Sequence, residues 1–304
     1  MTDVPGEIVV SRLTKQYGQL RAVDDLSFTV RPGRVTGFLG PNGAGKTTTL
    51  RMMLGLVRPT SGTATFSGVP YAELEEPIRH VGAVLEASSA HKGRTGRNHL
   101  RVMATAAGLP GSAADLALER VGLTPAANRK FKGYSLGMKQ RLGIAAAMLG
   151  DPGVLILDEP ANGLDPEGIR WMRDLLKALA AQGRTVLVSS HLLAEMQQLA
   201  DDVVIIAGGQ LIRQGPVADV LASLSVHQVR VRTPRPAELT AALEKEQAEV
   251  AELPDGALSV TGLDVARVGH LAFTAGVELH ELAGERADLE QVFLQLTAGR
   301  AGIR

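Results

Sequence analysis

A glycine-rich segment with a single lysine is the part of this sequence that points most directly to chemistry. It reads Gly40-Pro-Asn42-Gly43-Ala44-Gly45-Lys46-Thr47-Thr48 and follows the apolar run 35–39. Glycines let successive backbone N–H groups turn toward phosphate oxygens, and a helix starting at the lysine adds its positive end. The spacing G-x-x-x-x-G-K-[ST] predicts a phosphate-binding loop, with Lys46 on the β- and γ-phosphates and the Thr47 hydroxyl on Mg²⁺. The alternative is a glycine-rich turn without a ligand.

Two acids at the end of an apolar run form the second candidate. Residues 154–157 are apolar, and Asp158 and Glu159 follow them directly. Unpaired carboxylates at the tip of a buried strand are costly, and a bound metal ion accounts for them. We expect Asp158 to hold Mg²⁺ through its water shell and Glu159 to accept a proton from an attacking water. The alternative is a strand exit in which the pair caps a helix.

Two further side chains are candidates because of their position in the chain. His191 follows the expected strand 185–189, where it is placed to hydrogen-bond a γ-phosphate or to orient a water. Tyr17 precedes the glycine-rich segment, and an aromatic ring there can stack on adenine, a type of contact worth ~1–3 kcal/mol. For each residue the alternative is a structural role, a strand-end histidine in one case and a packing tyrosine in the other.

Composition excludes several classes of function. The 304 residues contain 32 Lys plus Arg and 32 Asp plus Glu, so there is no basic excess and we expect no nucleic-acid partner. The absence of cysteine excludes disulfides, cysteine-ligated zinc, iron–sulfur clusters and thiol catalysis. No apolar stretch reaches the ~18 residues of a spanning helix, so we expect the chain alone not to cross a membrane.

The candidate residues lie in a segment in which apolar strands alternate with amphipathic helices. This pattern predicts an α/β domain over residues 1–220 with a largely parallel sheet. The expected strands are 7–10, 34–39, 81–85, 154–157, 185–189 and 203–207, and the expected helices are 46–56, 98–106, 139–149, 168–181 and 192–199.

Residues 226–304 contain no long apolar strand, unlike the preceding segment, and predict a small accessory domain. The expected strands are 228–232, 249–253, 258–261 and 277–282, and the expected helices are 236–247, 263–275 and 288–297. This order predicts an α+β, ferredoxin-like βαββαβ domain followed by one helix. A stabilising or dimerising appendage and a ligand-sensing domain are both compatible with it.

Two more segments complete a family resemblance. The first resembles the signature motif of ATP-binding-cassette (ABC) ATPases and reads Tyr134-Ser135-Leu136-Gly137-Met138-Lys139-Gln140-Arg141. Its serine, Ser135, lies 23 residues before Asp158. Asn162-Gly163-Leu164-Asp165 resembles the D-loop of that family. The resemblance covers residues 5–215 and implies a P-loop NTPase fold with a helical signature subdomain, and an ATPase that uses ATP and Mg²⁺. It also implies that Ser135 and Gly137 touch the γ-phosphate of a second copy's ATP, and that Asp165 lies at the nucleotide.

Departures from the general family pattern narrow the resemblance. Leu136 and Met138 replace a glycine and a glutamine, and Glu86 stands where the family usually has glutamine, so we expect Glu86 as a metal-side contact. These features, with 94–100 and 288–297, resemble the drug- and peptide-antibiotic-resistance branch, including daunorubicin and bacitracin exporters. The resemblance implies a head-to-tail homodimer around two ATP molecules. This homodimer would drive a separately encoded membrane permease from the cytoplasmic face of the membrane, and residues 86–100 would form its contact surface with the permease.

Two other classes of function are alternatives to this exporter hypothesis. A soluble ABC ATPase acting on DNA would carry a long coiled coil between loop and signature, but only 88 residues separate Thr47 from Ser135. One acting on ribosomes would carry two cassettes and a basic linker, and this chain shows one cassette. A non-hydrolysing scaffold is disfavoured because the catalytic positions are filled, apart from the change at Glu86.

Overall fold

The chain folds into two compact units. One comprises Met1–Val217 with Phe293–Arg304, and the other comprises Ala218–Val292. The computed structural model describes residues 6–85, 90–222, 228–285 and 289–297. The domain limits of 1–220 and 226–304 stay a prediction.

A six-stranded sheet forms the centre of the first unit, with the order β10-β9-β3-β8-β7-β6. Neighbouring strands from β9 to β6 run parallel, and β10 is antiparallel to β9. All residues of β3 and β8 are buried, which explains why neighbouring positions such as Phe38 and Leu39, or 186–188, are apolar without a period-two alternation. The strands are β3 (Val35–Leu39), β6 (Val81–Val84), β7 (Val154–Asp158), β8 (Thr185–Ser190), β9 (Asp202–Ala207) and β10 (Gln210–Pro216).

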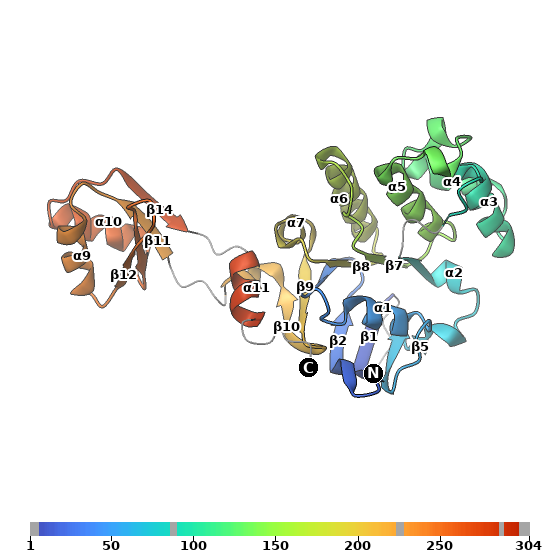
Figure 1. Cartoon of the computed structure of the whole chain (residues 1–304), viewed down its shortest axis with the longest axis horizontal. Coiled ribbons are helices and arrows are strands. Elements are labelled where there is room, and N and C mark those ends of the chain that lie inside the picture. The colour runs from blue at the N-terminus through green and yellow to red at the C-terminus, as the bar shows by residue number, and fades with distance from the viewer. Residues whose placement is uncertain (1–5, 86–89, 223–227, 286–288, 298–304) are drawn as a thin grey trace. The chain divides into compact units, whose positions relative to one another are not determined.

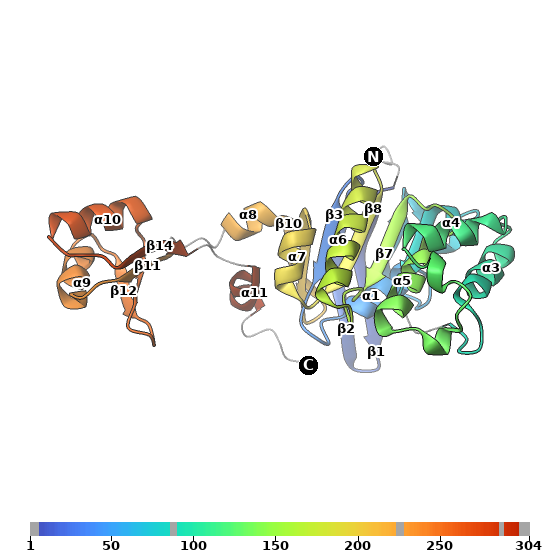
Figure 2. The same ribbon diagram turned by 90° about the horizontal axis from the view of Figure 1, so that it is seen from above.

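Both faces of this sheet are covered. Helices α6 (Pro166–Ala181) and α7 (Leu193–Leu199) lie on one face, and α1 (Lys46–Met53) lies on the other (Figures 1 and 2). Beyond α1 lies a second, antiparallel sheet with the order β2-β1-β4-β5. One hydrophobic core joins α1 to both sheets, and the Phe28 and Phe38 rings stack across it at 5.3 Å between centroids.

Most of the antiparallel sheet was not predicted, and backbone bulges interrupt the alternation of its first two strands. Its strands are β1 (Ile8–Tyr17), β2 (Leu20–Val30), β4 (Ser61–Phe66) and β5 (Val69–Pro70), whereas only 7–10 was expected. Arg12 and Asp25 have φ angles of 48° and 49°, and the β1–β2 register shifts beside each of them. Each bulge moves the following side chains to the opposite face, so the period-two pattern is lost.

A helical subdomain occupies the segment between β6 and β7. It contains α3 (Gly96–Ala106), α4 (Ser112–Arg120) and α5 (Leu136–Ala147), preceded by the short α2 (Pro77–His80). Helices α3 and α5 begin two and three residues earlier than expected, since the side chains of Thr95 and Ser135 cap their first turns. Across the described ranges, no helix is both long and apolar enough to cross a bilayer.

The second unit contains the predicted βαββαβ order, preceded by α8 (Val217–Ala222). Its elements are β11 (Gln228–Arg232), α9 (Pro236–Glu244), β12 (Glu249–Glu252), β13 (Leu258–Thr261), α10 (Val265–Thr274) and β14 (Glu281–Glu285). The helix α11 (Leu289–Thr297) follows in the chain and is divided between the units, since its residues from Phe293 onward belong to the first. The antiparallel sheet has the order β12-β13-β11-β14. Apolar residues from the sheet and both helices, including Val229, Val231, Leu239 and Val268, form its core.

The strand expected at 277–282 instead occupies Glu281–Glu285, because the end of α10 uses the preceding backbone. Gly276 has a φ of 66° and its N–H donates to the Phe273 carbonyl. The Val277 N–H donates to the Ala272 carbonyl at 2.9 Å, which completes a Schellman motif. Val277 therefore caps a helix and packs into the core rather than joining the sheet.

Candidate functional site

The glycine-rich loop joins β3 to α1 in the predicted strand–loop–helix arrangement. Gly43 and Gly45 have φ angles of 82° and 97°, a region that side chains rarely adopt. A Cβ on Gly45 would lie 2.5 Å from the Ala22 carbonyl oxygen, and one on Gly40 would lie 2.7 Å from that of Ile206. Close packing and backbone conformation thus both require glycine. Asn42 and Gly43 are exposed at the tip of the loop, Ala44 is buried, and Thr48 lies in the first turn of α1.

Lys46 is folded over this loop and is only 7% exposed. Its Nζ donates to the carbonyl oxygens of Gly40 at 2.7 Å and Pro41 at 3.4 Å. The same Nζ lies 3.7 Å from Oε1 of Glu159. A buried ammonium needs such partners. Its position between the loop and Glu159 leaves one positive charge where the terminal phosphate of a loop-bound nucleotide is expected.

Thr47 and Asp158 form a pair of hard oxygen donors beside Lys46. The Thr47 hydroxyl donates to Oδ2 of Asp158 at 2.7 Å, although the two residues are 111 positions apart. Within the described ranges, no group of three or more His, Cys, Asp or Glu is arranged to hold a metal ion. Mg²⁺ commonly takes only one or two protein ligands and completes its shell with phosphates and water. A hydroxyl and a carboxylate at this distance fit such a partial site.

Glu159 lies at the centre of the site in a strained backbone conformation. Its φ is 49°, which a non-glycine residue adopts at a cost of about 1–3 kcal/mol. Oε2 is 2.8 Å from Nδ1 of His191, which is 42% exposed and directly follows β8. The helix-capping interpretation of this acid pair is wrong. Helix α6 is capped instead by Asp165, and Asp158 accepts hydrogen bonds from the hydroxyls of Thr47 and Ser189.

The predicted signature and D-loop residues lie at the starts of two helices. Ser135 caps α5, and its Oγ accepts a hydrogen bond from the Met138 N–H at 3.2 Å. Gly137 lies in the first turn of α5. Oδ1 of Asp165 accepts a hydrogen bond from the Gly168 N–H at 2.7 Å, so the structure gives Asp165 a capping role. Its contact with nucleotide, like those of Ser135 and Gly137, stays a prediction.

Tyr17 and Glu86 complete the predicted site residues. Tyr17 ends β1 opposite Leu20 and is 49% exposed, with Nζ of Lys15 at 4.8 Å from the centre of its ring. Strand β2 continues from Leu20 to Ala22, whose carbonyl faces Gly45, so Tyr17 lies on the hairpin that borders the loop. Glu86 falls outside the residues that the structure describes.

Comparison with known proteins extends these observations to a family. A family model described as ABC transporter matches residues 23–162. The bacitracin transport ATP-binding protein BcrA of Bacillus licheniformis is 45% identical over 212 residues, which cover 69% of each chain. The chain belongs to the ABC transporter ATP-binding proteins. An uncharacterized ABC transporter ATP-binding protein of Bacillus subtilis, YhcH, is 48% identical over 67% of this chain and 68% of its own length.

One relative extends over both units of this ABC ATPase. The daunorubicin/doxorubicin resistance ATP-binding protein DrrA of Streptomyces peucetius is 34% identical over 98% of this chain and 94% of its own. A solved structure of an ATP-binding subunit of an ABC transporter matches with a TM-score of 0.64 and 29% identity, covering 71% of this chain and 92% of the other. Residues 227–290 match a family model described only as a domain of unknown function. The comparisons therefore establish the family but leave the role of the second unit open.

Ser189 is a residue of this ABC ATPase site that sequence reasoning missed. It is fully buried at the end of β8, and its Oγ donates to Oδ1 of Asp158. The Glu159 N–H donates to Oγ of Ser189 at 3.1 Å and to its carbonyl oxygen at 3.2 Å. Ser189 thus hydrogen-bonds the carboxylate of Asp158 and the backbone of Glu159. The available signal was its position, since β8 pairs with β7 in parallel and a polar residue ends both strands.

We expect Ser189→Ala to lower ATP turnover about 10–100-fold, the usual cost of losing a group that orients a ligating carboxylate. ATP binding to the loop should change far less, because the contacts described for Nζ of Lys46 are with Gly40, Pro41 and Glu159. The matched control is Ser190→Ala, since Ser190 is equally buried but its Oγ accepts only the Leu192 N–H in the described contacts. Steady-state hydrolysis separates the two variants. Equal turnover in both would contradict the assignment.

Proposed function

We propose that this chain is the ATP-hydrolysing subunit of an exporter and works as a head-to-tail pair around two ATP molecules, coupled to a separate membrane permease. The observation that carries the hydrolytic part is the convergence of Lys46, Thr47, Asp158, Glu159 and His191 at the ends of β3, β7 and β8. The transport part is supported by relatives named for bacitracin transport and daunorubicin/doxorubicin resistance. A soluble ATPase acting on ribosomes or DNA is not favoured by these relatives.

In this proposal the loop N–H groups and Lys46 hold the phosphates of ATP. The carboxylate of Glu159 accepts a proton from water as the water oxygen attacks the γ-phosphorus and the bond to the β–γ bridging oxygen breaks. His191 holds that carboxylate in place through Nδ1. When bound beside Thr47 and Asp158, Mg²⁺ would neutralise charge on the β- and γ-phosphates. Ser135 and Gly137 of the second copy would close each site, as the family resemblance implies.

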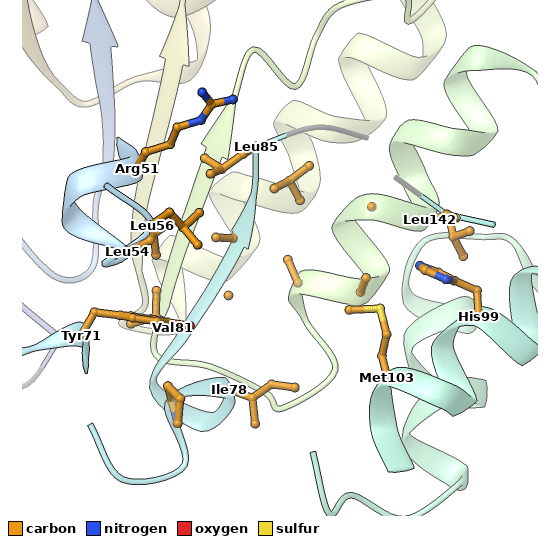
Figure 3. Close-up of a pocket in the computed structure, with 18 of the residues that line it drawn as sticks. Arg51, Leu54, Leu56, Tyr71, Ile78, Val81, Leu85, His99, Met103 and Leu142 are labelled. Atoms are coloured by element: carbon orange, nitrogen blue, oxygen red, sulfur yellow. The ribbon is translucent and has the colours of Figure 1, made fainter. Parts of the chain in front are cut away.

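A groove on this unit is the proposed permease contact. Its volume is about 700 Å³, and Figure 3 shows Leu54 and Leu56 on one side facing His99 and Met103 on the other. The wall between them is β6, which pairs in parallel with β7, the strand that ends in Asp158. An occupant of the groove therefore touches the strand next to the catalytic acids. This refines the expected contact surface of 86–100.

The chemistry of the groove matches an apolar helix with a polar group on one side. Most of its lining is aliphatic, and Leu56 is exposed. Burial lowers the pKa of His99, and the nearby charge of Arg94 lowers it further, so the imidazole is neutral at pH 7. Nδ1 of His99 is buried without a hydrogen-bond partner among the described residues. The imidazole of His99 also lines the groove, where a polar side chain of the permease would face it.

We expect Met103→Lys to abolish permease binding, because the described lining of the groove contains no acid that could pair with the lysine once the groove is covered. The isolated chain should hydrolyse ATP as before. Val102→Lys is the matched control, since Val102 is the adjacent residue of α3, is exposed and does not line the groove.

The experiment is an affinity purification of the tagged full chain carrying Glu159→Gln, with ATP and Mg²⁺, from detergent-solubilised membranes of the source cells. The proposal predicts recovery of a protein with several spanning helices, its loss with Met103→Lys and its retention with Val102→Lys. Recovery of ribosomes or DNA-processing proteins instead would overturn the transport proposal. Loss with both lysine variants would overturn the groove assignment alone.

A further inference from the structure

Two leucines interlock the signature with the D-loop inside one chain. Leu136 is the first residue of α5, and a Cβ built on Gly163 would lie 1.9 Å from its Cδ2 and 2.6 Å from its Cγ. The Leu136 side chain therefore fills the space that a side chain at Gly163 would need. In return, Cδ2 of Leu164 lies 3.4 Å from the position of a Cβ on Gly137.

The backbone ties the D-loop side of this contact to the catalytic acid. The Asn162 N–H donates to the carbonyl oxygen of Glu159 at 3.2 Å, and the Leu164 N–H donates to that of Ala161 at 3.1 Å. Gly163 thus directly follows a residue that is hydrogen-bonded to Glu159, and it lies four residues after Glu159 in the chain. Gly163 has a φ of 76°, so its conformation also resists replacement. A displacement of Leu136 is thus transmitted over a short, hydrogen-bonded segment.

The two ends of this connection serve different ATP molecules in the proposed dimer. Ser135 and Gly137, on either side of Leu136, would touch the nucleotide held by the second copy. Glu159 would act on the nucleotide held by its own chain. Leu136 is 54% exposed and occupies a position where the general family pattern has glycine, which has no side chain to make this contact.

We propose that Leu136 is a positioning residue that couples the two ATP sites, by packing the signature of one site against the D-loop that carries Glu159 of the other. This inference rests on the proposed two-site dimer. Packing transmits displacement because close-packed side chains do not deform continuously. Closure of the signature onto one ATP then sets the position of the acid at the other, and hydrolysis depends cooperatively on ATP concentration.

The first test is the ATP dependence of hydrolysis by the full chain. The wild-type chain should show a Hill coefficient between 1 and its limit of 2 for two sites. Leu136→Ala should reduce it to 1 and lower kcat about 10–100-fold, the effect of a small misplacement of a catalytic group. KM for ATP should change less than about twofold. Leu136→Met, which keeps a long apolar side chain at this position, should keep the wild-type Hill coefficient and kcat. The control is Leu116→Ala, since Leu116 is a comparably exposed leucine, at 56%, on α4.

A double-mutant cycle tests the contact itself. Gly163→Ala places a methyl group against Leu136, and its backbone strain is the same whether or not Leu136 is present. The loss of kcat and of thermal stability on Gly163→Ala should therefore be smaller in the Leu136→Ala background. Additive effects would show that the two residues do not interact and would overturn the proposal. A wild-type Hill coefficient of 1, or one unchanged by Leu136→Ala, would overturn the coupling.

Failure of the underlying dimer gives a different result. If the chain carrying Glu159→Gln stays monomeric with ATP and Mg²⁺ in size-exclusion chromatography, the proposed function fails along with the coupling. A dimer that forms normally while Leu136→Ala keeps the wild-type Hill coefficient overturns the coupling alone.

Discussion

Glu159→Gln is expected to lower ATP turnover by at least ~10²–10⁴-fold, the usual contribution of a positioned general base. The amide has the same shape as the carboxylate and can still accept a hydrogen bond, but it cannot take the proton of the attacking water. The strained conformation at Glu159, with φ at 49°, is a property of the backbone and is retained. The fall in turnover should therefore come from the chemical step and not from a disturbed fold.

Removal of the negative charge at Glu159 should also affect ATP binding. Nζ of Lys46 lies 3.7 Å from Oε1 of Glu159, so the carboxylate competes with phosphate for that lysine. ATP affinity in Glu159→Gln should be unchanged or higher, and the ATP-bound dimer should accumulate. Phosphate release, equilibrium ATP binding and size-exclusion chromatography measure the three quantities.

The control for this variant is Glu167→Gln, which neutralises an exposed acid in the first turn of α6. It should behave as the wild-type chain does in all three measurements. Turnover of Glu159→Gln within twofold of wild type would remove Glu159 from the role of general base. His191 would then be the next residue to test, since it contacts the same carboxylate.

We expect Lys46→Ala to weaken ATP binding as well as hydrolysis. Hydrogen bonds to charged groups contribute about 1.5–3 kcal/mol, which corresponds to about 10–100-fold in the dissociation constant. The same charge is aimed at the transferring phosphoryl group, so kcat/KM should fall by a further 10²–10³-fold or so. The variant should fail to form the ATP-dependent dimer.

Folding is the main concern for this variant, because Lys46 is buried and donates to the carbonyl oxygens of Gly40 and Pro41. Thermal unfolding without nucleotide identifies a chain that has lost its structure. Lys177→Ala, which removes an exposed lysine of α6, controls for charge. A folded Lys46→Ala chain that binds ATP with wild-type affinity would contradict the assignment of the phosphate-binding loop.

The parallel sheet was predictable because its strands are largely buried on both faces and therefore contain runs of consecutive apolar residues, such as 154–157 in β7 and 186–188 in β8. Strands β3, β6, β7, β8 and β9 lie within two residues of the predicted limits. Strand β2 and the end of β1 were missed because bulges at Arg12 and Asp25 reverse the face on which later side chains lie. The shift of β14 has a similar local cause, the capping of α10 by Gly276 and Val277. These features depend on hydrogen bonds that hydropathy does not encode.

The sequence alone located the phosphate-binding loop and the two acids at the end of β7, since each is a contiguous motif whose expected chemistry follows from its own residue types. It located the signature and the D-loop through their resemblance to the family motifs. The tertiary structure decided which motifs meet. It placed Thr47 against Asp158, His191 against Glu159, Ser189 beneath both acids and Leu136 over Gly163. The physical reason is that parallel pairing of β3, β7 and β8 brings their carboxyl ends to one edge. That order of strands is a property of the whole packed sheet and of no single segment.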